Sequence, residues 1–287
     1  VLQSSLGNLP ELFVGYFALR SGLIAVIQAA LVGSILGNSL LVLGLAFFVG
    51  GLRHGTQRFA SEVPRMIAVL TMLSVSALIL PTLVFFLQTP AAKHEDAFSL
   101  GSSVILLIIY VASIPVSLQG GPTALPEEME ESTRRWPLWL AVVILVVAGV
   151  GAAFVSDWFV ASLTPAINLL HLSQTFTGLV LVALAGNAVE NVVGVQLAAR
   201  NKMDYAISVI LNSSLQVALG LIPVLVLLSF VVGTTHLTLV LPPLLVVALA
   251  LTALLSTVIT YDGESTWLEG MALIGLYAII AVSFWWG

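Results

Sequence analysis

The sequence contains one short motif twice, as Gly7-Asn8-Leu9-Pro10-Glu11 and as Gly186-Asn187-Ala188-Val189-Glu190. The two copies are 179 residues apart. At the same offset and without a gap, Gly15 aligns with Gly194, Ser34 with Ser213, and Leu36 with Leu215. Both copies stand inside long apolar stretches. A motif repeated in this way predicts a chain built from two related halves.

The composition predicts that this chain is surrounded by lipid. Of its 287 residues, 59% are hydrophobic and 8% are charged, and the mean hydropathy is +1.12. Soluble domains carry roughly 25% charged residues because their surface faces water. The chain has a net charge of −5, lacks a basic tract for nucleic acid, and contains no cysteine for disulfide or thiolate chemistry.

Nine apolar segments are long enough to be read as membrane crossings, which need about 20 residues each. Only helices and closed barrels satisfy the backbone in lipid, and these runs are too long and uniform for barrel strands. We therefore predict an all-α integral membrane protein. The segments are 1–19, 23–51, 66–87, 99–118, 136–163, 174–199, 205–232, 237–260 and 267–286.

The loop charges predict the orientation of these crossings. Seven positive residues fall in alternate loops that share one side, and two fall on the other side. The positive-inside rule places the first set in the cytoplasm and the C-terminus outside. With this loop count the two motif copies run in opposite directions, as in transporters whose substrate site lies where inverted repeats meet. The seven are Arg53, Arg58, Arg65, Arg134, Arg135, Arg200 and Lys202, and the two are Arg20 and Lys93.

The predicted domain organisation is a first transmembrane repeat over 1–118, an acidic cytoplasmic linker over 119–135 and a second repeat over 136–287. Glu190 is preceded by 54 residues counted from Trp136, whereas only ten residues precede Glu11. We therefore expect about 44 residues of the first half, or more, to lie before Val1.

Glu11 and Glu190 stand out among the acidic residues because apolar sequence flanks each of them within its crossing. An ionisable side chain at that depth costs about 2.5–3.5 kcal/mol and usually faces a cavity or the bundle interior. Two of them at equivalent positions of a repeat predict a shared site. The structural alternative is a protonated glutamate that bonds neighbouring helices.

The motif residues suit a hard divalent cation. Ca2+ takes six to eight oxygen ligands, and two carboxylates balance its charge. Gly7, Gly186, Asn8, Asn187 and Pro10 interrupt the helices beside each glutamate, which frees backbone carbonyls and adds amide oxygens. Without a cation, neighbouring carboxylates in a poorly hydrated cavity favour their protonated forms. Ca2+ and H+ then exclude each other, as antiport requires. We expect Ca2+ to be a transported substrate, with no cofactor.

Further polar residues lie on the helices that follow each motif or in the linker. Gating or supporting roles compete with interhelical packing for Gln28, Ser34, Ser213, Ser214 and Gln216. Asp157, near the end of its segment, is either an interface residue or part of an outer access path. The linker glutamates form either a solvated connection or a cytoplasmic attractor for Ca2+; they are Glu127, Glu128, Glu130 and Glu131.

The paired motifs resemble the two signatures of the cation/proton exchangers (CAX), within the Ca2+/cation antiporter superfamily. The first signature is carried by 7–12, 17–20 and 32–38, and the second by 186–190, 201–204 and 212–216. The resemblance implies ten core helices in two inverted halves of five, with an extra N-terminal helix. It also implies that Glu11 and Glu190 bind Ca2+ or H+, supported by Gln28 and Gln216. Many members have His after the second glutamate, where this chain has Asn191.

A Ca2+/H+ antiporter of a prokaryotic plasma membrane is therefore the leading hypothesis, with Ca2+, H+ and lipid as the only partners expected. An Na+/Ca2+ exchanger or a broader Mn2+/H+ antiporter is the alternative. Dedicated Na+ sites favour hydroxyls beside each glutamate, yet the neighbours are Leu9, Pro10, Ala188 and Val189. An enzyme is not expected: a membrane hydrolase lacks its His-Glu-x-x-His motif here, and a channel would favour identical pore subunits. The sequence does not determine the oligomeric state.

Overall fold

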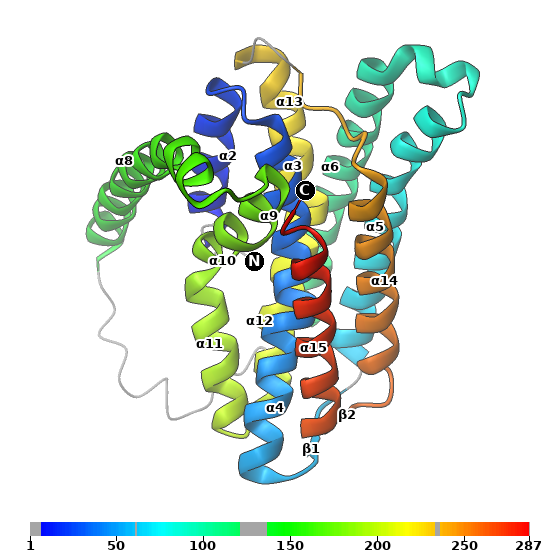
Figure 1. Cartoon of the computed structure of the whole chain (residues 1–287). Helices are drawn as coiled ribbons and strands as arrows, with labels where there is room; N and C mark the ends of the chain where they lie inside the picture. Colours follow the sequence, from blue (N-terminus) through cyan, green and yellow to red (C-terminus); the bar gives the residue numbers. More distant parts are fainter. Residues whose placement is uncertain (1–6, 61, 121–136, 233–235, 287) are drawn as a thin grey trace.

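A computed structural model describes residues 7–60, 62–120, 137–232 and 236–286, and it is almost entirely helical (Figure 1). Every predicted segment contains a helix, which confirms the all-α prediction. Five helices of 23 to 31 residues are long and apolar enough to cross a membrane, and a sixth span is bent by 64°. These helices lie within 24–54, 64–86, 90–114, 142–170 and 203–232, and the bent pair covers 174–199.

The two halves have matching elements with opposite directions. The boundaries in the second half repeat those of the first at an offset close to 179 residues. In Figure 1, α3, η1 and α4 descend, whereas α12, η4 and α13 rise, so the repeat is inverted. The pairs are α2 (Leu9–Arg20) with α11 (Ala188–Ala199), α3 (Ile24–Leu36) with α12 (Met203–Gln216), η1 (Gly37–Val42) with η4 (Val217–Leu221), and α4 (Leu43–His54) with α13 (Ile222–Val232).

The remaining helices surround this core in the same paired manner. α15 packs on α4 and α6 packs on α13, while α14 packs on α3 and α5 on α12. α8 packs along α2, and its remaining surface is largely exposed apolar side chains, as lipid contact requires. These elements are α5 (Glu62–Phe86), η2 (Pro90–His94), α6 (Glu95–Gly120), α8 (Leu138–Leu170), α14 (Pro243–Ile259) and α15 (Trp267–Ser283).

Close helix contact in the core depends on small residues. The bent span consists of α9 (Gln174–Phe176), η3 (Thr177–Val182), α10 (Ala183–Gly186) and α11, and its η3 crosses α3. A Cβ on Gly33 would lie 2.7 Å from Cα of Leu179, and one on Gly178 would lie 2.8 Å from Cβ of Ala29. The two backbones therefore touch, as small-residue interfaces allow. Gly37 has open space around it and does not share this role.

Two predicted segments differ in length from the structure. The fifth helix continues to Leu170, beyond the predicted end at residue 163, although it contains Pro165. The eighth helix begins at Pro243, six residues later than predicted. Pro242 and Pro243 explain this start, because proline favours an extended preceding residue and is tolerated in the first helical turn.

One end of the bundle, here called the strand end, is defined by β1 (Gln57–Arg58) and β2 (Glu264–Ser265), which pair antiparallel. Arg58 forms an ion pair with Glu264 at 3.1 Å. The side-chain amide of Gln57 donates to Asn201 Oδ1 at 2.8 Å, which joins the first half to the turn between α11 and α12. Five of the seven predicted cytoplasmic charges lie here, and Arg134 and Arg135 are outside the described residues.

The opposite end is closed by the extended segment 237–242. Gln28 Nε2 donates to the carbonyls of Thr238 and Val240 at 3.1 and 3.0 Å, and Thr82 Oγ1 donates to the carbonyl of Leu239 at 3.0 Å. This segment therefore joins α3 to α5 through side-chain hydrogen bonds to its backbone.

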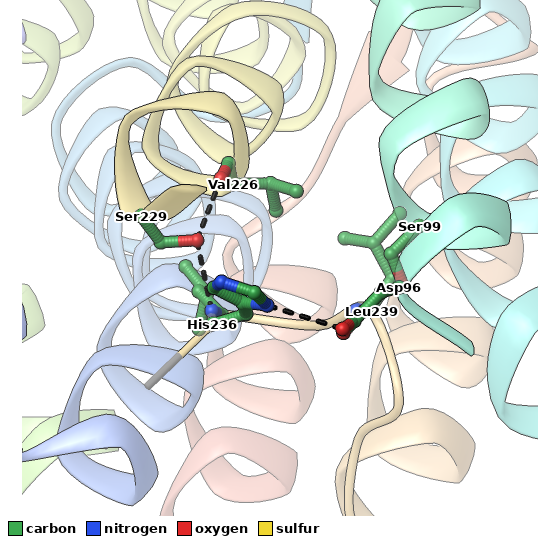
Figure 2. A network of polar contacts seen from close by, with 7 residues as sticks. Asp96, Ser99, Val226, Ser229, His236 and Leu239 are labelled. Atoms are coloured by element: carbon green, nitrogen blue, oxygen red, sulfur yellow. Dashed lines mark hydrogen bonds and ion pairs between the residues drawn. The ribbon is translucent and has the colours of Figure 1, made fainter. Parts of the chain in front are cut away.

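The same end carries a polar network, shown in Figure 2. His236 Nδ1 lies 3.1 Å from a carboxylate oxygen of Asp96, and the imidazole stacks on Phe230. Ser229 Oγ donates to the carbonyl of Val226 and accepts from the backbone N–H of Leu237. The network fixes the passage from α13 into the extended segment.

Candidate cation-binding site

The two motif glutamates face each other's motif across the centre of the bundle. Each lies in the first turn of its helix, Glu11 in α2 and Glu190 in α11. A Cβ on Gly186 would lie 2.8 Å from Cγ and 3.2 Å from Oε1 of Glu11, and a Cβ on Gly7 would collide with a carboxylate oxygen of Glu190. Each carboxylate therefore lies against the glycine of the other repeat. The structure brings the predicted pair together.

Both helices begin after a break at the motif asparagine. Asn8 (φ −81°, ψ 6°) and Asn187 (φ −92°, ψ 15°) leave the helical path by similar amounts. Pro10 explains the first break, because proline lacks the N–H of a continuous helix and fits its first turn. The second copy has no proline. There the Asn187 side chain donates to the carbonyl of Ala183 at 2.9 Å, which satisfies a group that the bend exposes.

Amide and hydroxyl side chains tie the two repeats together around the glutamates. Asn187 Nδ2 donates to Ser34 Oγ at 3.0 Å, and Asn38 Nδ2 donates to Asn187 Oδ1 at 3.1 Å and to Ser213 Oγ at 3.0 Å. These groups are all buried. Since their partners lie in the opposite half, the network fixes how the halves meet.

The first motif asparagine is fixed in the same way. Asn8 Nδ2 donates to Gln216 Oε1 at 3.2 Å, and both side chains are buried. The structure thus brings Gln216, Ser34 and Ser213 into the network around the motif asparagines, as predicted for supporting polar residues.

This arrangement leaves several buried oxygens without hydrogen-bond partners. They are both carboxylate oxygens of Glu11 and the Oδ1 atoms of Asn8 and Asn38. Their N–H groups are already committed to protein partners, so the free atoms are acceptors only. Buried oxygens of this kind need a ligand, since an unpartnered buried polar group is unfavourable. Carboxylate and amide oxygens are the atoms that Ca2+ prefers.

The glutamates are the charged part of this site. Glu11 is 8% exposed and Glu190 is partly buried. Within the described ranges, no group of three or more His, Cys, Asp or Glu side chains is placed to hold a metal ion. A cation bound here is therefore neutralised by two carboxylates, with neutral oxygens completing its ligand shell.

A small cavity leads from the site toward the opposite end. It has a volume of about 20 Å3, enough for a water molecule. Glu11, Ser34 and Gly186 line its inner part, and Ala18 and Val26 line its outer part near the α2–α3 turn. The path is apolar apart from its inner end.

Other predicted residues lie elsewhere. Gln28 binds the extended segment 237–242 and not the amide network. Ser214 Oγ pairs with Ser39 Oγ at 2.9 Å, which packs α12 on η1. Asp157 is exposed in the interior of α8, because that helix extends beyond its predicted end. The linker residues Glu127, Glu128, Glu130 and Glu131 lie outside the described residues.

Asn38 was not predicted to contribute to the site. It is 1% exposed and forms the centre of the amide network. A polar amide within the apolar run 23–51 was the available signal, but Asn38 aligns with Val217 in the second half. Because the repeat offset gave it no matching partner, the repeat argument passed over it.

Comparisons with known proteins agree with this architecture. The sequence is 36% identical to a Ca2+/H+ antiporter of Synechocystis over 99% of this chain and 81% of the relative. It is 35% identical to the Ca2+/H+ antiporter ChaA of Bacillus subtilis over 99% and 82%. The solved structure of native YfkE superposes with a TM-score of 0.83 at 32% identity, over 97% of this chain and 81% of that chain.

The family model for the sodium/calcium exchanger protein matches residues 2–119 and 140–286, one region in each half. The two matched regions correspond to the two inverted repeats of the structure. Together with the inverted fold and its paired central motifs, this match places the chain in the sodium/calcium exchanger protein family.

Proposed function

We propose that this chain is a secondary active transporter that exchanges Ca2+ for H+ across a membrane. The observation that carries this proposal is the pair of facing glutamates beside buried oxygens that lack hydrogen-bond partners. The names of its full-length relatives, Ca2+/H+ antiporters, support the same conclusion.

The transported Ca2+ binds between Glu11 and Glu190, with Asn8 Oδ1 and Asn38 Oδ1 as neutral ligands. The asparagine amides that hold the network keep these oxygens directed away from their own N–H partners. Backbone carbonyls at the helix breaks and water complete the six to eight ligands that Ca2+ takes. Asn187, Ser34, Ser213 and Gln216 hold the ligands in place.

Protons compete for the same carboxylates. Protonation removes the negative charge that balances Ca2+, so the site holds either the cation or protons. Inverted repeats that open alternately to the two sides then carry one species in each direction. Exchange follows because neither half-cycle leaves the carboxylates charged and empty in a dry interior.

The orientation of the chain follows from the charges at the strand end. Arg53, Arg58, Arg65, Arg200 and Lys202 meet there, whereas Arg20 and Lys93 belong to the opposite end. The positive-inside rule then places the strand end in the cytoplasm and the C-terminus outside. The bacterial relatives support a prokaryotic plasma membrane.

Uptake of 45Ca2+ into proteoliposomes tests the proposal. We expect a pH gradient to drive uptake without Na+, and an Na+ gradient without a pH gradient to drive none. Collapse of the pH gradient with a protonophore is the matched control. Uptake driven only by Na+ would identify an Na+/Ca2+ exchanger, and uptake of Mn2+ in preference to Ca2+ would identify a broader divalent antiporter.

A further inference from the structure

One more buried oxygen near the site has no hydrogen-bond partner, and it belongs to Asn191. This residue directly follows Glu190 in the first turns of α11. Its Oδ1 atom is inaccessible to solvent, and the protein groups around it do not donate to it. An amide oxygen in this state destabilises the fold unless a ligand or water uses it.

Asn191 lies on the face of α11 that packs into the core. Asn187, one turn earlier, is buried in the amide network. Gly194, three residues later, is buried against Ile210, to which a Cβ would approach within 2.7 Å. Residues three and four apart share one side of a helix. Asn191 therefore occupies the core-facing position between the amide network and Gly194, on the strand-end side of the network.

The first repeat has no such group. The position equivalent to Asn191 is Leu12, although glycine, asparagine and glutamate of the motif all match between the halves. Leucine and asparagine have similar length, so packing alone does not call for an amide in the second repeat only. The polar residue makes the site chemically asymmetric along the two inverted helices.

We propose that Asn191 is a specificity-determining ligand, whose Oδ1 binds the transported cation beside Glu190. This inference rests on the proposed function. An amide oxygen carries no titratable proton, so it remains a ligand at acidic pH, when the carboxylates take up protons. It also adds one oxygen to a shell that Ca2+ fills with six to eight ligands, whereas Mg2+ demands six in strict octahedral geometry.

Calorimetric titration of the purified protein with CaCl2 and with MgCl2 tests this role. We expect Asn191→Leu, which copies Leu12, to weaken Ca2+ binding by about tenfold and to weaken Mg2+ binding less. The thermal stability of the cation-free protein should stay equal or rise, because the substitution removes an unpartnered buried oxygen. A packing residue would instead lose stability, so a lower melting temperature or an unchanged Ca2+ affinity would overturn the proposal.

Asn191→Asp provides a second test with nearly unchanged side-chain volume. We expect tighter Ca2+ binding at neutral pH and a steeper loss of affinity on acidification, because a titratable oxygen replaces a neutral one. Equal pH profiles for this variant and the parent would contradict a ligand role. Ca2+ binding by the parent is independent of Asn191, so a parent that binds no Ca2+ would refute the proposed function itself, and a parent that binds Ca2+ equally with the leucine variant would refute this inference alone.

Discussion

Glu11 lies against Gly186 of the opposite repeat, and an added Cβ there would be only 2.8 Å from its Cγ. Glu190 has the same relationship with Gly7. Each carboxylate thus reaches the centre because the other repeat has no side chain at that point. This reciprocal contact explains why the motif needs its glycine as well as its glutamate.

Replacement of either glutamate by glutamine should abolish exchange. Glu11→Gln or Glu190→Gln removes one of two charges that balance Ca2+, and we expect affinity to fall by about 100-fold or more, equivalent to about 2.7 kcal/mol. Calorimetry and proteoliposome uptake measure the two effects. Asp157→Asn is the matched control, because Asp157 is exposed on α8. Normal transport by either glutamine variant would contradict the shared site.

Gly186→Ala should impair Ca2+ binding through steric contact. The new Cβ meets the Glu11 side chain, and overpacking of this kind costs about 1–3 kcal/mol. Gly149→Ala is the matched control, since a Cβ at Gly149 in α8 meets open space. We expect the control to keep full transport and to melt no lower than the parent, because alanine favours helix over glycine. Equal Ca2+ affinities in the two variants would show that Gly186 does not shape the site.

Ca2+ binding should release protons, and acidification should weaken Ca2+ affinity. Protons and Ca2+ use the same carboxylates, so lowering the pH fills them with protons, and by linkage a bound Ca2+ displaces those protons. Calorimetry in buffers of different ionisation enthalpy reports the released protons directly. Proton release near zero across pH 6–8, with a constant affinity, would contradict competition even if both glutamates bind Ca2+.

Single-cysteine labelling should place the strand end in the cytoplasm. The chain has no native cysteine, so each introduced thiol is unique. Thr56 and Lys93 are both exposed, the first beside β1 and the second in η2 at the opposite end. We expect a membrane-impermeant maleimide to label Lys93→Cys in intact cells and Thr56→Cys only after permeabilisation. The reverse pattern would invert the proposed orientation.

The acidic linker should tune transport without forming the site. Its glutamates lie outside the apolar spans, so their joint replacement by glutamine should shift the Ca2+ concentration for half-maximal uptake and preserve the maximal rate. Dose–response curves of 45Ca2+ uptake measure both quantities. A variant as inactive as Glu190→Gln would show that the linker belongs to the translocation site. The replaced residues are Glu127, Glu128, Glu130 and Glu131.

The sequence by itself determined the membrane-embedded helices, the inverted repeat and the central glutamates. Apolar length reports partition into lipid, which is a local property of each segment. The offset between Glu11 and Glu190 was visible because both halves carry the same residues. The break at Asn8 was also local, because Pro10 prevents a continuous helix.

Only the tertiary structure decided which polar groups meet. Gln28 has a polar side chain deep in a helix, as Gln216 does, yet one binds the extended segment 237–242 and the other binds Asn8. Asn38 becomes the centre of the network because η1 turns it toward Asn187. These contacts join residues more than 140 positions apart, so packing between the two halves sets them. A hydrogen bond forms with whichever partner that packing brings within reach, and no local pattern encodes that partner.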